Sequence, residues 1–196
     1  MTAAAVNDAP PDAQLTHMGM FVSDLDSMVA FYSRIFGLVV TDTGSNYRNQ
    51  SVAFLSRNPR EHHQLVLAQG RAKGTETTVQ QVSFEVAGLE ELRRFHARLV
   101  SLGVEDLAPR SHGNAWSIYF HDPEGNRVEI YTPTPWHVSQ PYGEPLDLTE
   151  PADVIRGKTL AMIKGDPSFC SQEQWAAGLR ARIAPESPAA VQGGGR

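Results

Sequence analysis

One order of predicted elements occurs twice in this chain, and this internal repeat limits the possible folds more than any other feature. In the first copy, the strand-like segment LTHMGMFV precedes apolar residues at three- and four-residue spacing, a helical pattern that ends at Gly37. In the second copy, TVQQVSFEV precedes a similar pattern that ends at Gly103. The two glycines are 66 residues apart, and His17 and Gln81, at the centres of the two first strands, are 64 apart. A nearly constant offset predicts two copies of one folding unit.

Three strand candidates follow each helical pattern. They are residues 38–41, 51–56 and 63–68 in the first copy, and 104–108, 116–121 and 127–131 in the second. Each copy is therefore predicted to be a βαβββ module, at residues 14–70 and 77–132. Each module would bury one sheet face by curling around a cavity. The expected fold is α+β, with two modules forming a curved sheet around one metal or substrate cavity.

The remaining segments differ in composition from the repeat. Residues 133–183 are rich in proline at first and then contain two short helical patterns, so we expect an arm that packs on the modules or on a partner subunit. Such an arm is consistent with a lid over the cavity and with a dimer contact, and we expect a homodimer. Residues 1–13 and 184–196 are poor in large apolar side chains, which predicts disorder at both ends.

Charge and cysteine content exclude several classes of function. The 196 residues include 22 acidic and 17 basic side chains, for a formal net charge of −5. No run of Lys or Arg is present, which argues against nucleic-acid binding. No apolar stretch reaches the roughly 18 residues that span a bilayer, so no membrane association is expected. Cys170 has no cysteine partner, which is typical of a protein of the reducing cytoplasm.

Metal-binding side chains occur at four predicted strand positions, namely His17, His63, Gln81 and Glu129. Imidazole and carboxylate groups are common ligands of divalent ions, and three on one face leave positions open for a substrate. A single histidine in a strand is more often a hydrogen-bonded structural residue. Glu129 lies between two apolar residues, and a carboxylate facing inward there would need a cation or hydrogen-bond donors. Periodicity alone allows it equally to face solvent.

Three segments resemble signature stretches of the vicinal oxygen chelate superfamily, which includes glyoxalases, bleomycin resistance proteins and type I extradiol dioxygenases. They are LTHMGMFVSDLDSMVAFYSRIFGL, VQQVSFEVAGLEEL and YFHDPEGNRVEIY, and the resemblance covers residues 15–132. It implies that the first-strand histidine and the last-strand glutamate, here His17 and Glu129, are metal ligands.

Within this superfamily the chain is most similar to single-domain extradiol dioxygenases. The stretch HHQLVL resembles the one whose second histidine, here His63, faces substrate and dioxygen. SHGNAWSIYF resembles the one whose histidine, here His112, contacts a substrate hydroxyl, and His121 replaces the tyrosine that follows in the family. The larger departure is Gln81, where the dioxygenases have a ligand histidine, although related isomerases and lyases use glutamine. His62 should point away from His63 because strand side chains alternate.

The resemblance implies an Fe(II)-dependent dioxygenase that cleaves a small catechol-like aromatic diol with dioxygen. His17, Gln81 and Glu129 would hold the ion, His63 would be the acid or base, and His112 or His121 would hold a substrate oxygen. Gln81 also agrees with a lyase, isomerase or epimerase of the superfamily that uses Mn(II), Co(II) or another divalent ion. A third possibility is a metal-free protein that binds a small molecule, as resistance proteins do.

Overall fold

The first module is a four-stranded sheet covered by one helix. The computed structural model describes residues 13–183. The two segments predicted to be disordered, 1–13 and 184–196, lie outside the described residues except for residue 13. The module consists of β1 (Met18–Val22), α1 (Leu25–Phe36), β2 (Val39–Ser45), β3 (Ser51–Ser56) and β4 (Leu65–Gln69). The strand order is β1-β4-β3-β2, with β1 parallel to β4 and the other pairs antiparallel.

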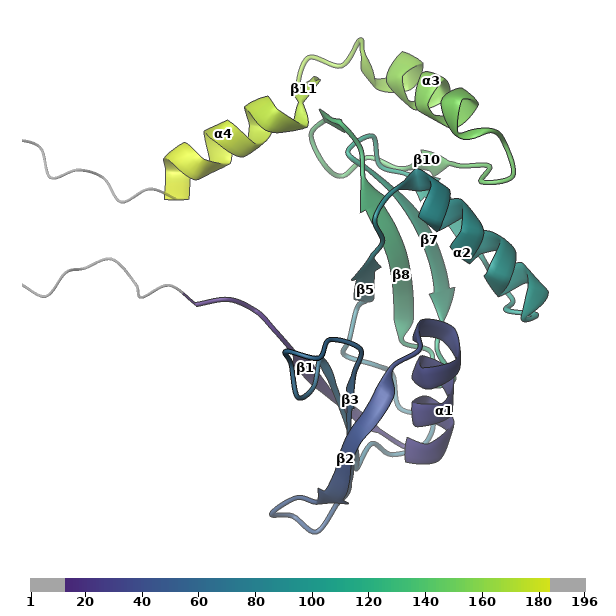
Figure 1. Cartoon of the computed structure of the whole chain (residues 1–196), viewed down its shortest axis with the longest axis vertical. Coiled ribbons are helices and arrows are strands. Elements are labelled where there is room, and N and C mark those ends of the chain that lie inside the picture. The colour runs from purple at the N-terminus through teal and green to yellow at the C-terminus, as the bar shows by residue number, and fades with distance from the viewer. Residues whose placement is uncertain (1–12, 184–196) are drawn as a thin grey trace, which may run out of the picture.

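The second module repeats this arrangement (Figure 1). It consists of β5 (Val82–Glu85), α2 (Leu89–Ser101), β6 (Ala108–Ser111), β7 (Ala115–His121) and β8 (Arg127–Pro133). Its strand order is β6-β7-β8-β5, again with the first strand parallel to the last, and β10 (Glu144–Pro145) adds a strand beside β6. The two βαβββ modules expected from the repeat are therefore confirmed. Their sheets remain separate and do not close into a barrel.

Local sequence explains where α1 begins and ends. The Asp24 side chain accepts a hydrogen bond from the Ser27 backbone N–H at 3.0 Å, which caps the first turn. Gly37 has a φ of 68° and donates its N–H to the Ser33 carbonyl, a left-handed ending that favours glycine. Between these caps the helix buries one face against its own sheet and the second module.

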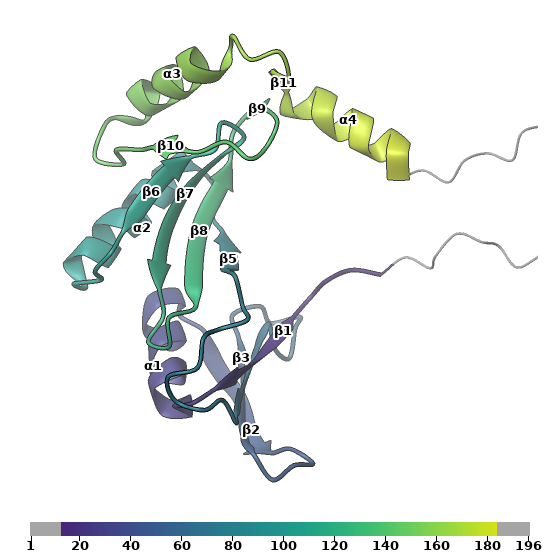
Figure 2. The ribbon, with the colours of Figure 1, turned by 180° about the vertical axis from the view of Figure 1, so that it is seen from behind.

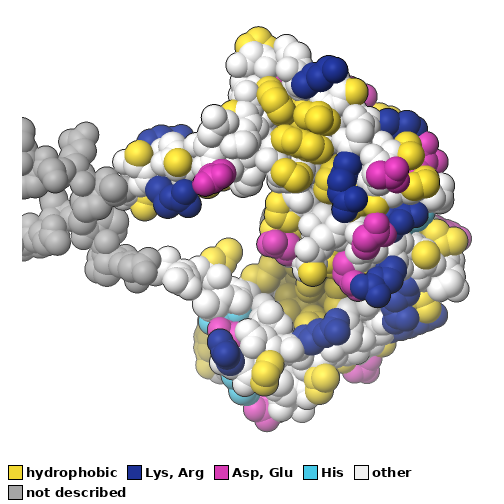
Figure 3. Space-filling model, turned by 45° about the horizontal axis from the view of Figure 1, so that its top comes forward, with side chains coloured by type: hydrophobic (Ala, Val, Ile, Leu, Met, Phe, Trp, Pro, Cys, Tyr) yellow, Lys and Arg dark blue, Asp and Glu magenta, His cyan; other side chains and the backbone are white. Residues whose placement is uncertain are grey.

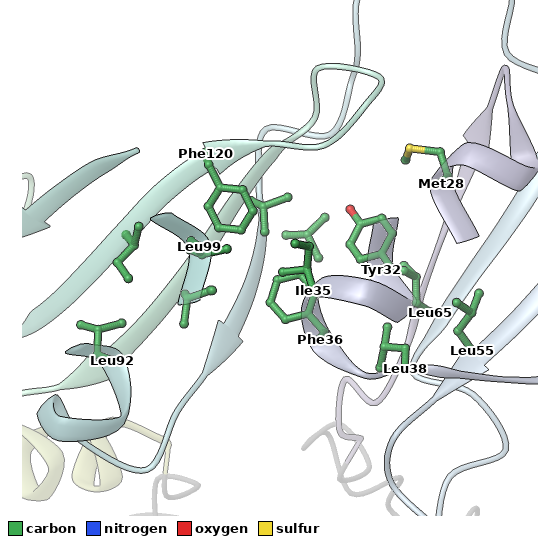
Figure 4. Close-up of a cluster of buried hydrophobic side chains, with 14 of the residues drawn as sticks. Met28, Tyr32, Ile35, Phe36, Leu38, Leu55, Leu65, Leu92, Leu99 and Phe120 are labelled. Atoms are coloured by element: carbon green, nitrogen blue, oxygen red, sulfur yellow. The ribbon is translucent and has the colours of Figure 1, made fainter. Parts of the chain in front are cut away.

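Aromatic side chains join the two modules at α1 (Figure 4). The ring of Phe36 stacks on Phe84 of β5, with centroids 3.7 Å apart, and lies 6.5 Å from Phe120 of β7. Polar contacts reinforce this junction, because the Glu124 carboxylate accepts hydrogen bonds from the backbone N–H groups of Ser23 and Asp24. The hairpin turn of the second module is thereby fixed to the start of α1.

The C-terminal arm lies at the far end of the second module (Figure 2). It contains β9 (Trp136–His137), α3 (Ala152–Ile163), β11 (Cys170–Ser171) and α4 (Gln172–Ile183). Helix α3 buries Ile155 and Ile163, whereas α4 has no buried residue and extends away from the modules. In the described part of the chain, no helix has both the length and the apolar character needed to cross a membrane.

Candidate functional site

Glu129 is a carboxylate in the middle of the second sheet and is only 7% exposed. In β8 it is paired with Tyr119 of β7 on one side and Ser83 of β5 on the other. The Tyr119 hydroxyl donates to Oε1, and the Ser83 hydroxyl donates to Oε2 at 2.6 Å. The Gln81 amide, one residue before β5, also donates to Oε2 at 3.0 Å. Both carboxylate oxygens are thus held by neutral donors.

Tyr119 is itself held from two directions. Its hydroxyl lies 2.8 Å from Nε2 of His112, which follows β6, and the guanidinium of Arg127 lies 3.8 Å from the centre of its ring. Burial, followed by the hydrogen bond to Glu129, raises the pKa of Tyr119 to about 12. The phenol therefore remains protonated at neutral pH and remains able to donate to the carboxylate.

A second group of polar side chains lies at the edge of the first sheet. The rings of His17, one residue before β1, and His63, two residues before β4, have centroids 4.4 Å apart. His62 places Nδ1 2.9 Å from Nδ1 of His63 and Nε2 2.7 Å from the carboxylate of Asp42. Partial burial lowers the pKa of His63, and the neighbouring imidazoles of His17 and His62 lower it further. The prediction that His62 points away from His63 is wrong.

The six predicted site residues are therefore divided among different places. The structure brings Gln81, Glu129 and, through Tyr119, His112 together in the second module, and it brings His17 and His63 together in the first. Within residues 13–183, no three His, Cys, Asp or Glu side chains are arranged to hold a metal ion. His121 ends β7 and borders a cavity of about 520 Å³ between α1 and the segment after α2. Neither Glu129 nor His17 lines this cavity.

Three hydroxyl groups of this site were absent from the sequence prediction. Ser83 and Tyr119 flank Glu129 in the sheet, and Ser117 is two residues before Tyr119 on the same strand and so on the same face. Among the described residues, the Ser117 hydroxyl is buried without a hydrogen-bond partner. The second sheet therefore presents a buried carboxylate and, opposite Tyr131 two residues further along β8, a buried hydroxyl.

Comparison with known proteins identifies related sequences. Residues 14–130 match the family model described as the Glyoxalase/Bleomycin resistance protein/Dioxygenase superfamily. Biphenyl-2,3-diol 1,2-dioxygenase 3 from Rhodococcus globerulus is 29% identical over 123 residues, which are 60% of this chain and 62% of that protein. Metallothiol transferase FosB from Lysinibacillus sphaericus (strain C3-41) is 28% identical over 129 residues, which are 61% of this chain and 82% of that protein. The match thus spans less than two thirds of the dioxygenase.

Solved structures show the same fold at lower identity. A glyoxylase/bleomycin resistance protein/dioxygenase domain from Frankia sp. EAN1pec has a TM-score of 0.53 and 21% identity, covering 63% of this chain and all (100%) of that one. A variant of the fosfomycin resistance protein FosX from Listeria monocytogenes, complexed with Mn(II) and 1S,2S-dihydroxypropylphosphonic acid, has a TM-score of 0.50 and 22% identity. That match covers 63% of this chain and 95% of the FosX chain.

Proposed function

The chain belongs to the Glyoxalase/Bleomycin resistance protein/Dioxygenase superfamily, and from this premise we propose that it is a divalent-metal enzyme that cleaves a catechol-like aromatic diol with dioxygen. The observation that carries the metal proposal is the environment of Glu129. Neutral hydrogen bonds do not cancel the charge of a buried carboxylate, and buried charges in proteins are usually paired with an opposite charge or coordinate a metal ion. The partners of Glu129 are the neutral groups of Gln81, Ser83 and Tyr119, and no Lys or Arg among the described residues forms an ion pair with it.

The donors present fit a divalent cation. Glu129 provides an anionic oxygen, Gln81 an amide oxygen and His17 an imidazole nitrogen, which together suit Fe(II), Mn(II) or Co(II). A bound ion would supply a Lewis acid that draws two substrate oxygens and dioxygen to one place. Within the chain, His63 would accept the substrate's hydroxyl proton and later return it, because burial and the neighbouring imidazoles lower its pKa and so favour the neutral ring.

We infer that a second copy of the chain completes this site. His17 contacts Thr16 and His63 rather than Glu129, and no metal-binding set of three is formed within the described residues. The space between the modules is hollowed and lined with hydrophobic side chains (Figure 3). Phe21, on the same face of β1 as His17, is 52% exposed. In a twofold dimer, the first module of each copy would cover the second module of the other and bring an imidazole to each carboxylate.

A complementation experiment tests this arrangement. His17→Ala and Glu129→Ala chains should each bind no stoichiometric Mn(II), because each dimer lacks one ligand type at both sites. Mixed after unfolding and refolding together, they should recover binding, since a mixed dimer keeps one intact site. Glu85→Gln, which changes an exposed glutamate on the neighbouring strand, serves as the control and should bind normally. Metal content that persists in Glu129→Ala would remove the metal proposal, and failure of the mixture to bind would remove the shared site.

The reaction class is tested separately. The named dioxygenase relative and the match at His63 support ring cleavage, so the Fe(II)-loaded protein should consume oxygen with substituted catechols and form a yellow ring-fission product. A second candidate is a non-oxidative reaction such as thiol addition, which the amide of Gln81 and the metallothiol transferase relative favour. Thiol consumption with Mn(II) and fosfomycin, without oxygen uptake from any catechol, would replace the first candidate by the second.

A further inference from the structure

A continuous series of hydrogen bonds connects the C-terminal arm to Glu129. The backbone carbonyl of Tyr142 lies 2.6 Å from Nδ1 of His112, which must donate because a carbonyl oxygen can only accept. Nε2 of the same ring lies 2.8 Å from the Tyr119 hydroxyl, and this hydroxyl donates its single proton to Oε1 of Glu129. Nε2 must therefore donate to the phenol oxygen, so the series requires an imidazole that carries a proton on both nitrogens. Both nitrogens of His112 are therefore engaged within the protein. The imidazole is not free to face a substrate.

The arm is fixed at the point where it meets His112. The Gln140 side-chain amide donates to the His112 carbonyl at 2.9 Å, and its oxygen accepts the Tyr142 N–H at 3.1 Å. Two residues later, Glu144 pairs with Ser111, the residue before His112. The segment 140–145 is thus attached on both sides of the imidazole, and its carbonyl group has a defined position.

Tyr119 is the only donor to Oε1 among the described residues, whereas Ser83 and Gln81 share Oε2. Loss of the phenol hydroxyl would release one carboxylate oxygen and allow the group to rotate. Partners of this kind orient metal ligands, and removing them commonly costs about 10- to 100-fold in metal affinity.

We propose that His112 is a positioning residue, and that the arm, through His112 and Tyr119, fixes the Glu129 carboxylate in the orientation that binds the metal ion. This inference rests on the proposed function, because it takes Glu129 to be a ligand. The arm is then a support of the site, which differs from the lid and the dimer contact considered from the sequence alone.

A double-mutant cycle on Mn(II) binding tests the proposal, with affinity measured by calorimetry and ligand geometry by electron paramagnetic resonance. Tyr119→Phe and His112→Phe should each lower the affinity about 10- to 100-fold. The double variant should be no weaker than Tyr119→Phe alone, because His112 acts through the hydroxyl. Both single variants should alter the Mn(II) spectrum in the same way.

Two further variants examine the arm itself. Gln140→Ala loosens the segment and should lower the affinity in the wild-type background but not in Tyr119→Phe. Tyr142→Ala keeps the backbone carbonyl and should bind as the wild type does, which makes it the matched control. Gln140→Ala also preserves the test if His112→Phe does not fold.

The outcomes separate this inference from the proposed function. If Glu129→Ala abolishes binding while His112→Phe and Gln140→Ala change the affinity less than twofold, the positioning role is wrong and the metal site stands. The positioning role would also be overturned if the losses of Mn(II) affinity caused by His112→Phe and Tyr119→Phe were fully additive in the double variant. Additive losses would mean that His112 acts independently of the Tyr119 hydroxyl. If the wild type binds no Mn(II), the proposed metal site itself fails.

Discussion

Asp122 is the centre of a buried hydrogen-bond network that joins the two modules, and its removal should strongly destabilise the protein. The side chain is 5% exposed and accepts from the Tyr32 hydroxyl at 3.0 Å and from the Asn126 amide at 2.7 Å. It also accepts from the backbone N–H groups of Glu124 and Asn126, which shapes the hairpin turn between β7 and β8. Tyr32 belongs to α1 of the first module, so one carboxylate connects both halves of the fold.

The size of the effect follows from the donors that Asp122→Ala would leave without a partner. Tyr32 and Asn126 are 0% and 1% exposed, so water cannot replace the lost acceptor without local rearrangement. A buried donor left unsatisfied costs about 1–3 kcal/mol, so these two side-chain donors alone give about 2–6 kcal/mol. The backbone N–H groups of Glu124 and Asn126 lose the same acceptor, so this range is a lower bound. Tyr32→Phe removes one of these donors. In that background, Asp122→Ala should therefore cost about 1–3 kcal/mol less than in the wild type.

Urea unfolding followed by circular dichroism measures these differences, provided that the slope of the transition is unchanged. Asp42→Ala is the matched control, because the Asp42 side chain is 68% exposed and pairs only with His62 among the described residues. An exposed pair of this kind contributes about 0–1 kcal/mol. Two results would show that the network does not stabilise the fold as argued. In one, Asp122→Ala lowers the free energy of unfolding no more than Asp42→Ala does. In the other, Asp122→Ala lowers it equally in the wild type and in the Tyr32→Phe background.

Three other substitutions have clear expected outcomes. Burial, assisted by the neighbouring Asp122 carboxylate, raises the pKa of Tyr32 above its ordinary value. The phenol therefore ionises first in the unfolded state, and the free energy of unfolding should fall as the pH rises above about 10. Tyr32→Phe should make this fall shallower when urea unfolding is measured at several pH values. Gly113→Ala should destabilise the arm, because φ is +74° and the new Cβ would lie 2.5 Å from a Val138 methyl group, and a lowered thermal midpoint would show it. Phe36→Ala removes the ring that stacks on Phe84 and should cost about 3–5 kcal/mol of unfolding free energy; a cost below 1 kcal/mol would contradict the central position of this ring.

The fold was predictable to the extent that the sequence repeats itself. Helical spacing and the closing glycines define the modules, and the strand expected at residues 51–56 is β3 with the same bounds. The second strand was expected to end at residue 41 but continues to Ser45, because the polar residues there pair with β3. That pairing depends on the partner strand and not on local composition. The open arrangement of the sheets depends likewise on contacts such as Phe36 with Phe84, which periodicity does not show.

The prediction for His62 shows how a boundary error becomes an error about a site. Alternation of side chains applies only within a strand, and β4 begins at Leu65, two residues after His63. The chain bends at His62, so both imidazoles lie on one side and their Nδ1 atoms are 2.9 Å apart. With Asp42 on its other nitrogen, His62 is held from both sides and would help to hold the His63 ring in the proposed site.

Of the two hydroxyl groups that hydrogen-bond to Glu129, that of Tyr119 could have been located from the sequence and that of Ser83 could not. The turn DPEGN fixes the β7–β8 hairpin, with His121 opposite Arg127, and counting back two residues on each strand places Tyr119 opposite Glu129. Tyr119 was therefore within reach of sequence reasoning. No turn connects β5 to β8, which are parallel, so the pairing of Ser83 with Glu129 depends on how α2 and the intervening strands pack. The carboxylate is thus fixed on one side by a local hairpin and on the other by the tertiary fold, and its geometry should be sensitive to both.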